Sequence, residues 1–197
     1  MLTTNRLDWW EQAWAYKDHG KNWSVVYEEG ERRRGFRWLH ESFGTNWRML
    51  EMQAAIGRIQ LRRMVEWHER RSANAERLTG FFSSLAGLRI AIPPLNTEHG
   101  WYKFYAFVRP EVLVPGWNRD RIIEEINAAG VPCFSGSCSE VYLEKAFDGT
   151  GWRPAERFPV AKVLGETSLM FLIHPTLAEE EIEKTGEVVA EVMRRAV

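Results

Sequence analysis

The sequence has only two cysteines among its 197 residues, Cys133 and Cys138. Two are too few for the disulfide framework that stabilises many small secreted proteins. They also lack the histidine partners that would complete a zinc site at this spacing. We therefore expect no metal site, and a reducing cytoplasm as the compartment.

The chain also lacks an excess of charge of one sign, because its 26 Lys and Arg residues are balanced by 27 Asp and Glu residues. Such a chain has no overall field that favours nucleic acid or an anionic membrane. The arginine run at 32–34 and the arginines between 62 and 71 are the exceptions that a phosphate backbone would suit. Interleaved glutamates favour a solvated, ion-paired helix face instead. Nucleic-acid binding is the minor alternative.

Long hydrophobic runs are absent as well. No stretch approaches the roughly 20 apolar residues that span a bilayer. Residues 1–6 lack the apolar run of a secretory signal. Repeats and low-complexity segments are not found either. Hydrophobic residues nevertheless make up 45% of the chain, which is enough for a sizeable core. We expect a globular chain with no membrane partner.

The most informative stretch is residues 44–61, a short polar loop followed by a predicted helix. Apolar or small residues recur on two faces of this helix, at Met49, Met52, Ile56 and Ile59 and at Leu50, Ala54, Gly57 and Leu61. A surface helix normally has one apolar stripe, so we predict a helix buried on two sides. Its N-terminus suits an anion; the alternative is a core helix that its first residues cap. The pattern continues to residue 85, with a possible break at Gly80.

Residues 87–197 predict a small α+β domain. Strands are expected at 87–92, 101–108, 131–134 and 167–173, and helices at 118–129, around 143–147, at 158–164 and from 176 onward. Asn118 and Gly130 suit the two ends of one helix. Thr176 and Glu179 suit a capping box. The order β-β-α-β-α-β-α predicts a small sheet with helices packed on one face.

The first 43 residues carry fewer signals. Residues 1–4 predict a short strand, and Asn5 suits the N-cap of a helix that ends at Gly20. Residues 22–43 show no clear periodicity. A strand at the first residue suggests a chain that begins in the middle of a domain.

Several of these segments resemble the DegT/StrS-type sugar aminotransferases, which are pyridoxal-phosphate (PLP) enzymes of the aspartate-aminotransferase fold, fold type I. The matching segments follow the family's order and are 1–4, 18–21, 44–49, 53–57, 60–61, the tyrosines 102 and 105, 130–147 and 171–177. They cover nearly the whole chain, but only about the C-terminal half of such an enzyme.

The resemblance implies an α/β enzyme divided in a particular way. Residues 1–48 would be a remnant of the large cofactor-binding domain, 49–86 a long linking and interface helix, and 87–197 the small C-terminal domain. The lysine that carries the cofactor would precede residue 1, and none of the six lysines here lies in its motif. No catalytic residue is expected in this chain. Alone it should neither bind PLP nor transaminate.

In the whole enzyme, the resemblance implies amino transfer from glutamate to a keto-sugar nucleotide by a homodimer, in the biosynthesis of cell-surface polysaccharide. Asn46 matches the asparagine that reaches the cofactor phosphate of the neighbouring subunit. Ser135 and Ser137 are candidate substrate contacts. The alternative is that their loop is an ordinary turn without a substrate role. His174 is a candidate for the sugar site or a structural histidine. Arg48 suits a pairing with an acid in the dimer interface or with a phosphate, and the structural role is favoured.

One departure from the family concerns the start of the long helix, where Leu50 replaces a Ser, Thr or Asp. Loss of that cap costs about 1 kcal/mol. Thr45 or Asn46 caps the helix instead, or its first turn is left to Glu51; a capping Asn46 would have a weaker phosphate role. A function of another class is a non-catalytic dimerisation or regulatory module, which the missing lysine and the two-sided apolar helix would suit.

Overall fold

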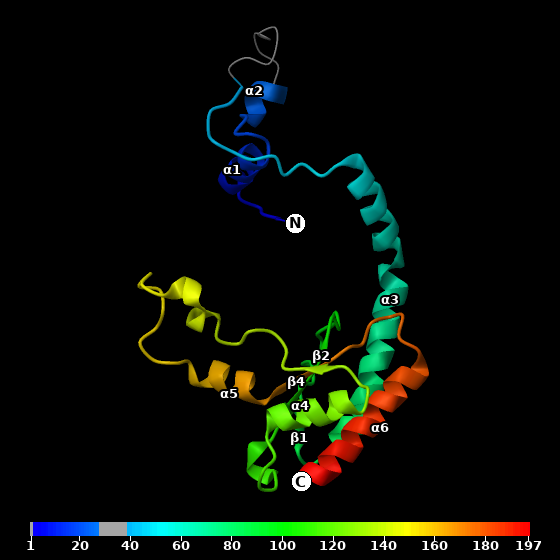
Figure 1. The fold of residues 1–197 in the computed structure, drawn as a ribbon. Coiled ribbons are helices and arrows are strands. Elements are labelled where there is room, and N and C mark those ends of the chain that lie inside the picture. Colours follow the sequence, from blue (N-terminus) through cyan, green and yellow to red (C-terminus); the bar gives the residue numbers. More distant parts are fainter. Residues whose placement is uncertain (1, 28–38) are drawn as a thin grey trace. The chain divides into compact units, whose positions relative to one another are not determined.

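The computed structural model describes residues 2–27 and 39–197, so the arginine run at 32–34 lies outside the described residues. The chain forms two compact units, Met1–Arg62 (unit 1) and Arg63–Val197 (unit 2). One helix, α3 (Glu51–Ser83), runs through the division (Figure 1). None of the described helices is both long enough and apolar enough to cross a membrane.

The described residues of unit 1 form two short helices, α1 (Leu7–Lys17) and α2 (Trp23–Tyr27), before α3 begins. Edge-to-face aromatic pairs join them: the ring centroids of Trp10 and Trp23 are 5.5 Å apart, and those of Trp14 and Tyr27 are 6.0 Å apart. No apolar side chain among the described residues of unit 1 is buried. Aromatic contacts and backbone hydrogen bonds therefore join the described parts of this unit without a closed core.

Two predictions at the start of the chain are wrong. Residues 2–4 form no strand, because none of the described residues pairs with them in a backbone ladder. The N-cap residue of α1 is Arg6 rather than Asn5, and no side chain caps the helix. The Thr4 hydroxyl accepts the Arg6 N–H at 3.1 Å and sets the entry to the helix.

The long helix α3 has 33 residues and continues through Gly80 without the break that its glycine permits. Neither Thr45 nor Asn46 caps it, since both lie outside its first turn. Instead the Gln53 side-chain oxygen accepts the N–H of Leu50 at 2.9 Å. This is the N3 half of a capping box, working without a side-chain acceptor at the position of Leu50.

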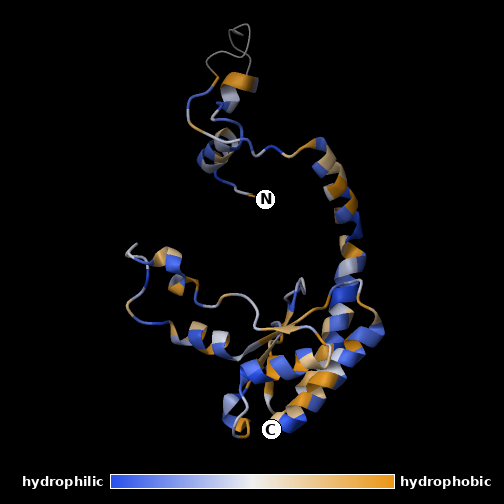
Figure 2. Ribbon diagram, in the orientation of Figure 1, coloured by the Kyte–Doolittle hydropathy of each residue, from blue (hydrophilic) through white to orange (hydrophobic). Residues whose placement is uncertain are grey.

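The predicted burial of α3 on two sides is wrong for this chain. Met52, Ile56 and Ile59 are 72%, 53% and 44% exposed, because no described residue packs over them. In Figure 2 the part of α3 nearest its N-terminus carries several hydrophobic bands. Farther along, Ala75, Leu78 and Phe82 are fully buried in unit 2.

Unit 2 is built on a four-stranded antiparallel sheet in the order β1-β2-β4-β3. Its strands are β1 (Leu88–Ile90), β2 (Phe104–Val108), β3 (Cys133–Phe134) and β4 (Ser168–Phe171). Phe104 pairs with Phe171 across the centre of the sheet, and Phe134 with Met170 at its edge. Each strand lies within a predicted segment and is shorter, because pairing stops where the partner strand ends.

The helices of unit 2 are α4 (Arg119–Ala128), α5 (Pro159–Thr167) and α6 (Glu179–Ala196), with short 3-10 turns η1 (Pro110–Val112), η2 (Val141–Leu143) and η3 (Lys145–Phe147). The predicted order β-β-α-β-α-β-α is confirmed. Asn118 caps α4 by accepting the N–H of Arg121 at 2.9 Å. Gly130 follows with a φ of 76°, which favours glycine.

The cap of α6 was predicted two residues too early. The helix begins at Glu179 after Ala178, and the Glu181 carboxylate accepts the N–H of Ala178 at 2.8 Å. Alanine has no side-chain acceptor, so only this half of a capping box forms. Thr176 instead bonds to His174 in the preceding turn.

The core of unit 2 joins the sheet to α3, α4 and α6. Phe82 of α3 packs against Phe104 of β2 and Phe171 of β4, with ring centroids 5.7 and 5.1 Å apart. Residues 104, 106 and 108 of β2 are buried on this face and alternate with half-buried residues on the other. The fold is an α+β layer in which α3, α4 and α6 pack on one face of the sheet, in the arrangement that the sequence predicts.

Candidate functional site

The loop that carries Asn46 is fixed to the end of α1 by backbone hydrogen bonds. The N–H of Thr45 donates to the carbonyl of Tyr16 at 2.7 Å, and that of Trp47 to Lys17 at 2.9 Å. A Cβ at Gly44 would lie 2.5 Å from the backbone nitrogen of Gly20, so only glycine fits there. The backbone of residues 44–48 is therefore held in one place, although its side chains are mostly exposed.

Asn46 lies exposed on this loop beside a guanidinium group. The Arg48 Nε–H donates to the Asn46 Oδ1 at 3.4 Å. Arg48 also lies 3.5 Å from the carboxylate of Asp18, which pairs with Lys21 at 3.3 Å. Burial acts to raise the pKa of Asp18, but the Lys21 hydrogen bond and the charges of Lys21, Arg48 and Lys17 outweigh it and lower the pKa. Asp18 is thus a carboxylate paired with Lys21 and Arg48. Its pairing with Arg48 helps to hold the loop of residues 44–48.

The donors of this loop suit a phosphate group. With Oδ1 engaged by Arg48, the Asn46 amide presents its N–H₂ group outward, and a guanidinium lies next to it. Charge-assisted donors of this kind bind phosphate oxygens. The loop has no partner for a pyridine nitrogen, because the carboxylate of Asp18 is already paired with cations. These donors would suit the phosphate of PLP.

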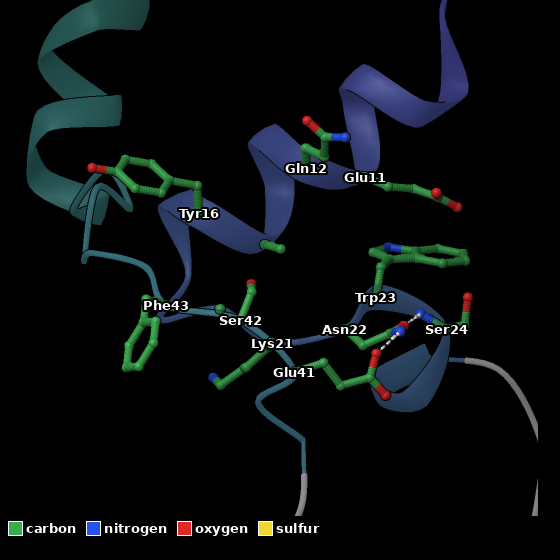
Figure 3. Close-up of a pocket in the computed structure, with 12 residues that line it drawn as sticks. Glu11, Gln12, Tyr16, Lys21, Asn22, Trp23, Ser24, Glu41, Ser42 and Phe43 are labelled. Atoms are coloured by element: carbon green, nitrogen blue, oxygen red, sulfur yellow. Dashed lines mark hydrogen bonds between the residues drawn. The ribbon is translucent and has the colours of Figure 1, made fainter.

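A hollow of about 360 Å³ lies beside α1 and α2 in unit 1 (Figure 3). The Asn22 side chain forms one wall, donating to Glu41 at 2.5 Å and accepting the Ser24 N–H at 2.9 Å. Asn46 does not line it. No sequence pattern predicts this hollow, since residues 22–43 show no periodicity.

The second candidate site is the serine-rich loop of unit 2, which borders a pocket of about 500 Å³. Its lining residues are Arg119, Ser135, Gly136, Ser137, Cys138, Ser139, Glu140, Leu143, Glu144, Lys145 and Gly165. The Ser168 hydroxyl donates to the Ser135 carbonyl at 2.6 Å, and the Tyr105 hydroxyl lies 3.3 Å from the Ser137 Oγ. The structure thus brings the predicted residues Ser135 and Ser137 into one pocket and ties their loop to the sheet.

Gly136 is the position where this loop needs glycine. Its φ is 92°, and a Cβ there would lie 2.5 Å from the ring of Tyr105. The close approach lets the Ser137 N–H donate to the Tyr105 hydroxyl at 3.3 Å. Contact with the Tyr105 side chain therefore fixes the position of Gly136 and Ser137 relative to β2.

A buried carboxylate, Glu140, holds the far side of the same pocket. Two N–H groups of Arg157 donate to it, and so does the Tyr142 hydroxyl at 2.6 Å. The Arg157 and Tyr142 hydrogen bonds lower the pKa of Glu140 to about 2. Burial, followed by the bond to Glu140, raises the pKa of Tyr142. No sequence pattern indicates this cluster, because its charged partners are 17 residues apart and form no motif.

Arg153 and Arg119 hold further parts of the pocket wall. Arg153 donates to the carbonyls of Tyr142, Leu143 and Glu144 at 2.9–3.1 Å and so fixes η2. Arg119 donates to the Ser168 carbonyl at 3.2 Å. Hydroxyl groups border one space together with the Arg119 guanidinium, the Lys145 ammonium and the carboxylates of Glu140 and Glu144. This combination of donors and acceptors suits a polyhydroxylated ligand.

Two other predicted candidates lie apart from this pocket. His174 is exposed in the turn after β4, where its Nδ1 lies 2.8 Å from the Thr176 hydroxyl and accepts the Thr176 N–H at 3.4 Å. It does not line the serine pocket. Cys133 is buried, and burial raises its pKa to about 12. The described residues hold no cluster of three or more His, Cys, Asp or Glu side chains that would suit a metal.

A long helix leading into a small antiparallel sheet with helices is the C-terminal part of the fold type I, PLP-dependent transferase fold. The family model of the DegT/DnrJ/EryC1/StrS aminotransferases matches residues 1–192. The chain belongs to this family.

Relatives support the assignment. An aminotransferase structure from Psychrobacter cryohalolentis is 53% identical, with a TM-score of 0.89 over 98% of this chain and 51% of that one. The erythromycin biosynthesis sensory transduction protein EryC1 of Saccharopolyspora erythraea is 30% identical over 73% of this chain and 37% of its own. The dTDP-3-amino-3,4,6-trideoxy-alpha-D-glucose transaminase of Streptomyces venezuelae is 29% identical over 81% and 40%. The chain spans between 37% and 51% of the length of these relatives.

Proposed function

We propose that this chain is the C-terminal portion of a PLP-dependent aminotransferase that transfers an amino group from glutamate to a keto-sugar nucleotide. The observation that carries the proposal is the family match over residues 1–192. The Streptomyces venezuelae relative, which is named as an amino-sugar transaminase, supports the substrate class. The cofactor lysine and the catalytic residues then belong to the N-terminal part, and this chain alone is inactive. Two free cysteines agree with a cytoplasmic enzyme.

In that enzyme the three predicted parts have separate roles. Residues 1–48 complete the large domain, residues 49–86 link the domains and contribute to the homodimer interface, and residues 87–197 form the small domain. PLP supplies an electron-withdrawing ring that stabilises negative charge on the carbon bearing the amino group. This chain contributes residues that bind and position the cofactor phosphate and the nucleotide sugar.

Asn46 donates an amide N–H to the cofactor phosphate held by the neighbouring subunit of the homodimer. Arg48 orients that amide, because its bond to Oδ1 leaves the N–H₂ group pointing outward. The fixed backbone of residues 44–48 supports this role, since a preorganised donor loses little conformational entropy on binding.

Ser135 and Ser137 bind hydroxyl or phosphate groups of the nucleotide sugar, because both line the pocket that Arg119 and Lys145 also border. His174 contributes from the turn after β4. Its Nδ1 is engaged by Thr176, which leaves Nε2 as the ring nitrogen available to a substrate. Arg153 and Glu140 take no part in chemistry and hold the pocket wall.

A fused protein tests the activity. Residues 1–197 are joined behind the part of the Psychrobacter cryohalolentis aminotransferase that this chain does not match. We expect the fusion to dimerise, to bind PLP and to consume glutamate in the presence of a keto-sugar nucleotide, whereas the chain alone neither binds PLP nor consumes glutamate. A folded, PLP-loaded fusion that aminates no member of a panel of keto-sugar nucleotides would refute the proposed substrate class.

Replacing the phosphate donor gives the first prediction. In the fusion, Asn46→Ala should raise the Kd for PLP about tenfold or more, because a hydrogen bond to a charged group contributes about 1.5–3 kcal/mol. Absorbance titration of PLP measures the change. Asn5→Ala, another exposed asparagine of unit 1, is the matched control and should leave the Kd unchanged.

A mixed dimer tests whether Asn46 serves the neighbouring subunit. One subunit carries Asn46→Ala, and the other keeps Asn46 but has its cofactor lysine replaced. If Asn46 acts across the interface, the one site with a lysine is complete and binds PLP with the Kd of the unaltered fusion. Weak PLP binding by this dimer would place Asn46 at its own subunit's site.

The alternative function is a non-catalytic dimerisation or regulatory module. The exposed apolar residues of α3 favour association of some kind. Size-exclusion chromatography with a cofactor absorbance scan separates the two proposals. A stable dimer of the chain alone, together with an inactive fusion, would favour the module.

A further inference from the structure

The turn that precedes β2 has a strained backbone at a bulky residue. Trp101 has a φ of 42°, in the left-handed region that residues with a large side chain rarely adopt. Gly100, the residue before it, has no positive φ, so the glycine does not carry this strain. Such a conformation persists only where its surroundings hold it in place. The contacts of Trp101 therefore show what the turn depends on.

Two contacts hold Trp101 in this conformation. Its indole ring stacks on Phe104 of the core, with ring centroids 5.9 Å apart and 18° between the planes. Its backbone N–H donates to the Nδ1 of His99 at 3.1 Å, and the His99 ring lies edge-to-face against the indole at 4.3 Å. Because a backbone N–H can only donate, Nδ1 carries a lone pair and the proton of the His99 ring is on Nε2. The observed turn therefore requires a neutral His99.

A second histidine attaches the same turn to α3. The Nε2–H of His68 donates to the His99 carbonyl at 3.0 Å, since a carbonyl can only accept. The Nδ1 of His68 lies 3.5 Å from the carboxylate of Glu98, whose side chain is 85% exposed. Protonation of His68 keeps the bond to the carbonyl and adds an exposed ion pair, which contributes little. His68 therefore anchors the turn in both of its protonation states.

The bond from the Trp101 N–H to His99 has the spacing of an Asx turn, in which Asn or Asp accepts the N–H of the second residue after it. Asparagine would keep that acceptor at every pH. Imidazole instead gains a proton within the physiological range, and the protonated ring has two donors and no acceptor. Other charged or titratable groups at this turn are His68 and Glu98, while the Lys103 ammonium lies 5.5 Å from the centre of the Tyr102 ring. The choice of histidine makes the turn dependent on pH.

We propose that residues 98–101 form a pH-sensitive turn in which His99 is the sensor and His68 is the anchor. At pH 8 the neutral His99 ring accepts the Trp101 N–H and keeps the turn closed. At pH 5 the protonated ring directs an N–H at the Trp101 N–H, so Trp101 leaves the left-handed region and the turn opens. Tyr102 follows directly and is 81% exposed, so the switch changes how its side chain is presented to solvent. The inference rests on the fold of unit 2 and does not depend on the proposed activity.

Amide hydrogen exchange in the whole chain tests the proposal. The protection factor of the Trp101 amide, corrected for the intrinsic effect of pH on exchange, is measured by NMR at pH 8 and at pH 5. We expect it to fall about tenfold at pH 5, the change that corresponds to the loss of one hydrogen bond. The amides of β2 are followed in the same spectra and should keep their protection, which excludes general unfolding.

Four variants make the test specific. His99→Asn keeps an acceptor for the Trp101 N–H and should hold the protection factor high at both pH values. His99→Ala removes the acceptor and should give the low value at both. His68→Ala removes the anchor alone, so it should lower the value at pH 8 and retain a fall at pH 5. His19→Asn replaces an exposed histidine of unit 1 and is the matched control, which should keep the full response.

A protection factor that is equal at pH 8 and pH 5 in the unaltered chain overturns the proposal, and so does a Trp101 amide without protection at pH 8. A tenfold fall in His99→Asn would assign the response to another group and also overturns it. A fall that His99→Asn abolishes and His19→Asn keeps supports the proposal. In the unaltered chain, the His99 ring signals should shift over the same pH interval as the Trp101 amide signal, a comparison that needs no variant. Circular dichroism at both pH values checks that each variant keeps the fold.

Discussion

The two ends of α3 have similar apolar spacing and opposite environments. Leu78 and Phe82 are fully buried between the sheet and α6, whereas Met52 and Ile56 are mostly exposed. The helix is one continuous element of 33 residues, so local propensity does not distinguish its two ends. The difference comes from what packs against each end. An apolar pattern shows which residues are suited to burial, and the rest of the fold decides whether this chain buries them.

The same contrast extends to the polar groups. Each unit has a buried carboxylate with cationic partners, Asp18 in unit 1 and Glu140 in unit 2. Asp18 pairs with Lys21 and Arg48 beside an exposed loop. Glu140 instead lies within a network that fixes a pocket wall. Unit 1 therefore presents polar groups outward, while unit 2 uses them to fix its own structure.

The largest expected effect is on the core. Phe82→Ala should lower the free energy of unfolding of unit 2 by about 3–5 kcal/mol, because it leaves a cavity between Phe104 and Phe171. Ile56→Ala in the isolated chain should change it by under about 0.5 kcal/mol, as an exposed substitution does. Urea unfolding followed by circular dichroism measures both. A comparable loss in Ile56→Ala would mean that the first part of α3 is covered in solution and would break the comparison.

The next largest difference should come from comparing two asparagine substitutions, one in each unit. Asn127 donates to the Cys133 carbonyl at 2.8 Å and accepts the Cys133 N–H at 3.1 Å, joining α4 to β3. Asn127→Ala should cost about 1–3 kcal/mol, because it leaves these half-buried backbone groups unpaired. Asn46→Ala in the isolated chain should cost under about 0.5 kcal/mol. Equal losses in the same unfolding assay would assign Asn46 a structural role.

A smaller effect, dependent on pH, is expected at Glu140, since its partner Arg157 is partly exposed to water. The pKa of Glu140 falls from its ordinary value of 4.5 to about 2 in the folded chain. The ionised form therefore stabilises the fold above pH 4.5, and this contribution is lost as the pH falls to 2. Glu140→Gln should be less stable than the unaltered chain at pH 7, and the gap should close between these two values. A gap that persists unchanged below pH 2 would contradict the assignment.

The smallest effects concern the two open glycines of α3. Gly57→Ala and Gly80→Ala should each stabilise the isolated chain by about 0.5–1 kcal/mol, because alanine favours the helix and a Cβ meets nothing at either site. Helical content and thermal unfolding by circular dichroism report the change. A lower helical content or a lower unfolding temperature in either alanine variant would show that the space around that glycine is occupied in solution.

Much of unit 2 could be predicted from the sequence because its partners lie within the chain. The aromatic and β-branched segment around Phe104 pairs with β1 and β4, and Asn118 and Gly130 mark helix ends by local chemistry. Predictions failed where a residue needed a partner elsewhere. Residues 2–4 have no described strand to pair with, and the cap of α6 shifted because Thr176 bonds back to His174.

The candidate sites were predictable in part. Ser135 and Ser137 share a pocket as their loop implied, because Tyr105 and Ser168 fix both ends of that loop. The carboxylate of Glu140 was missed, since its pairing with Arg157 depends on how a long loop folds back. The role of Asn46 stays a prediction. Its backbone is fixed within unit 1, whereas the phosphate it is proposed to meet would belong to another subunit.

The tryptophans of unit 1 have an optical consequence. The chain has ten tryptophans, and five described ones lie in unit 1: Trp9, Trp10, Trp14, Trp23 and Trp47. None of these five is buried, so water relaxation should shift their fluorescence to long wavelength. Any polypeptide that covers this unit will move the emission to shorter wavelength. The chain therefore carries its own spectroscopic signal for the arrival of a partner, without an attached dye.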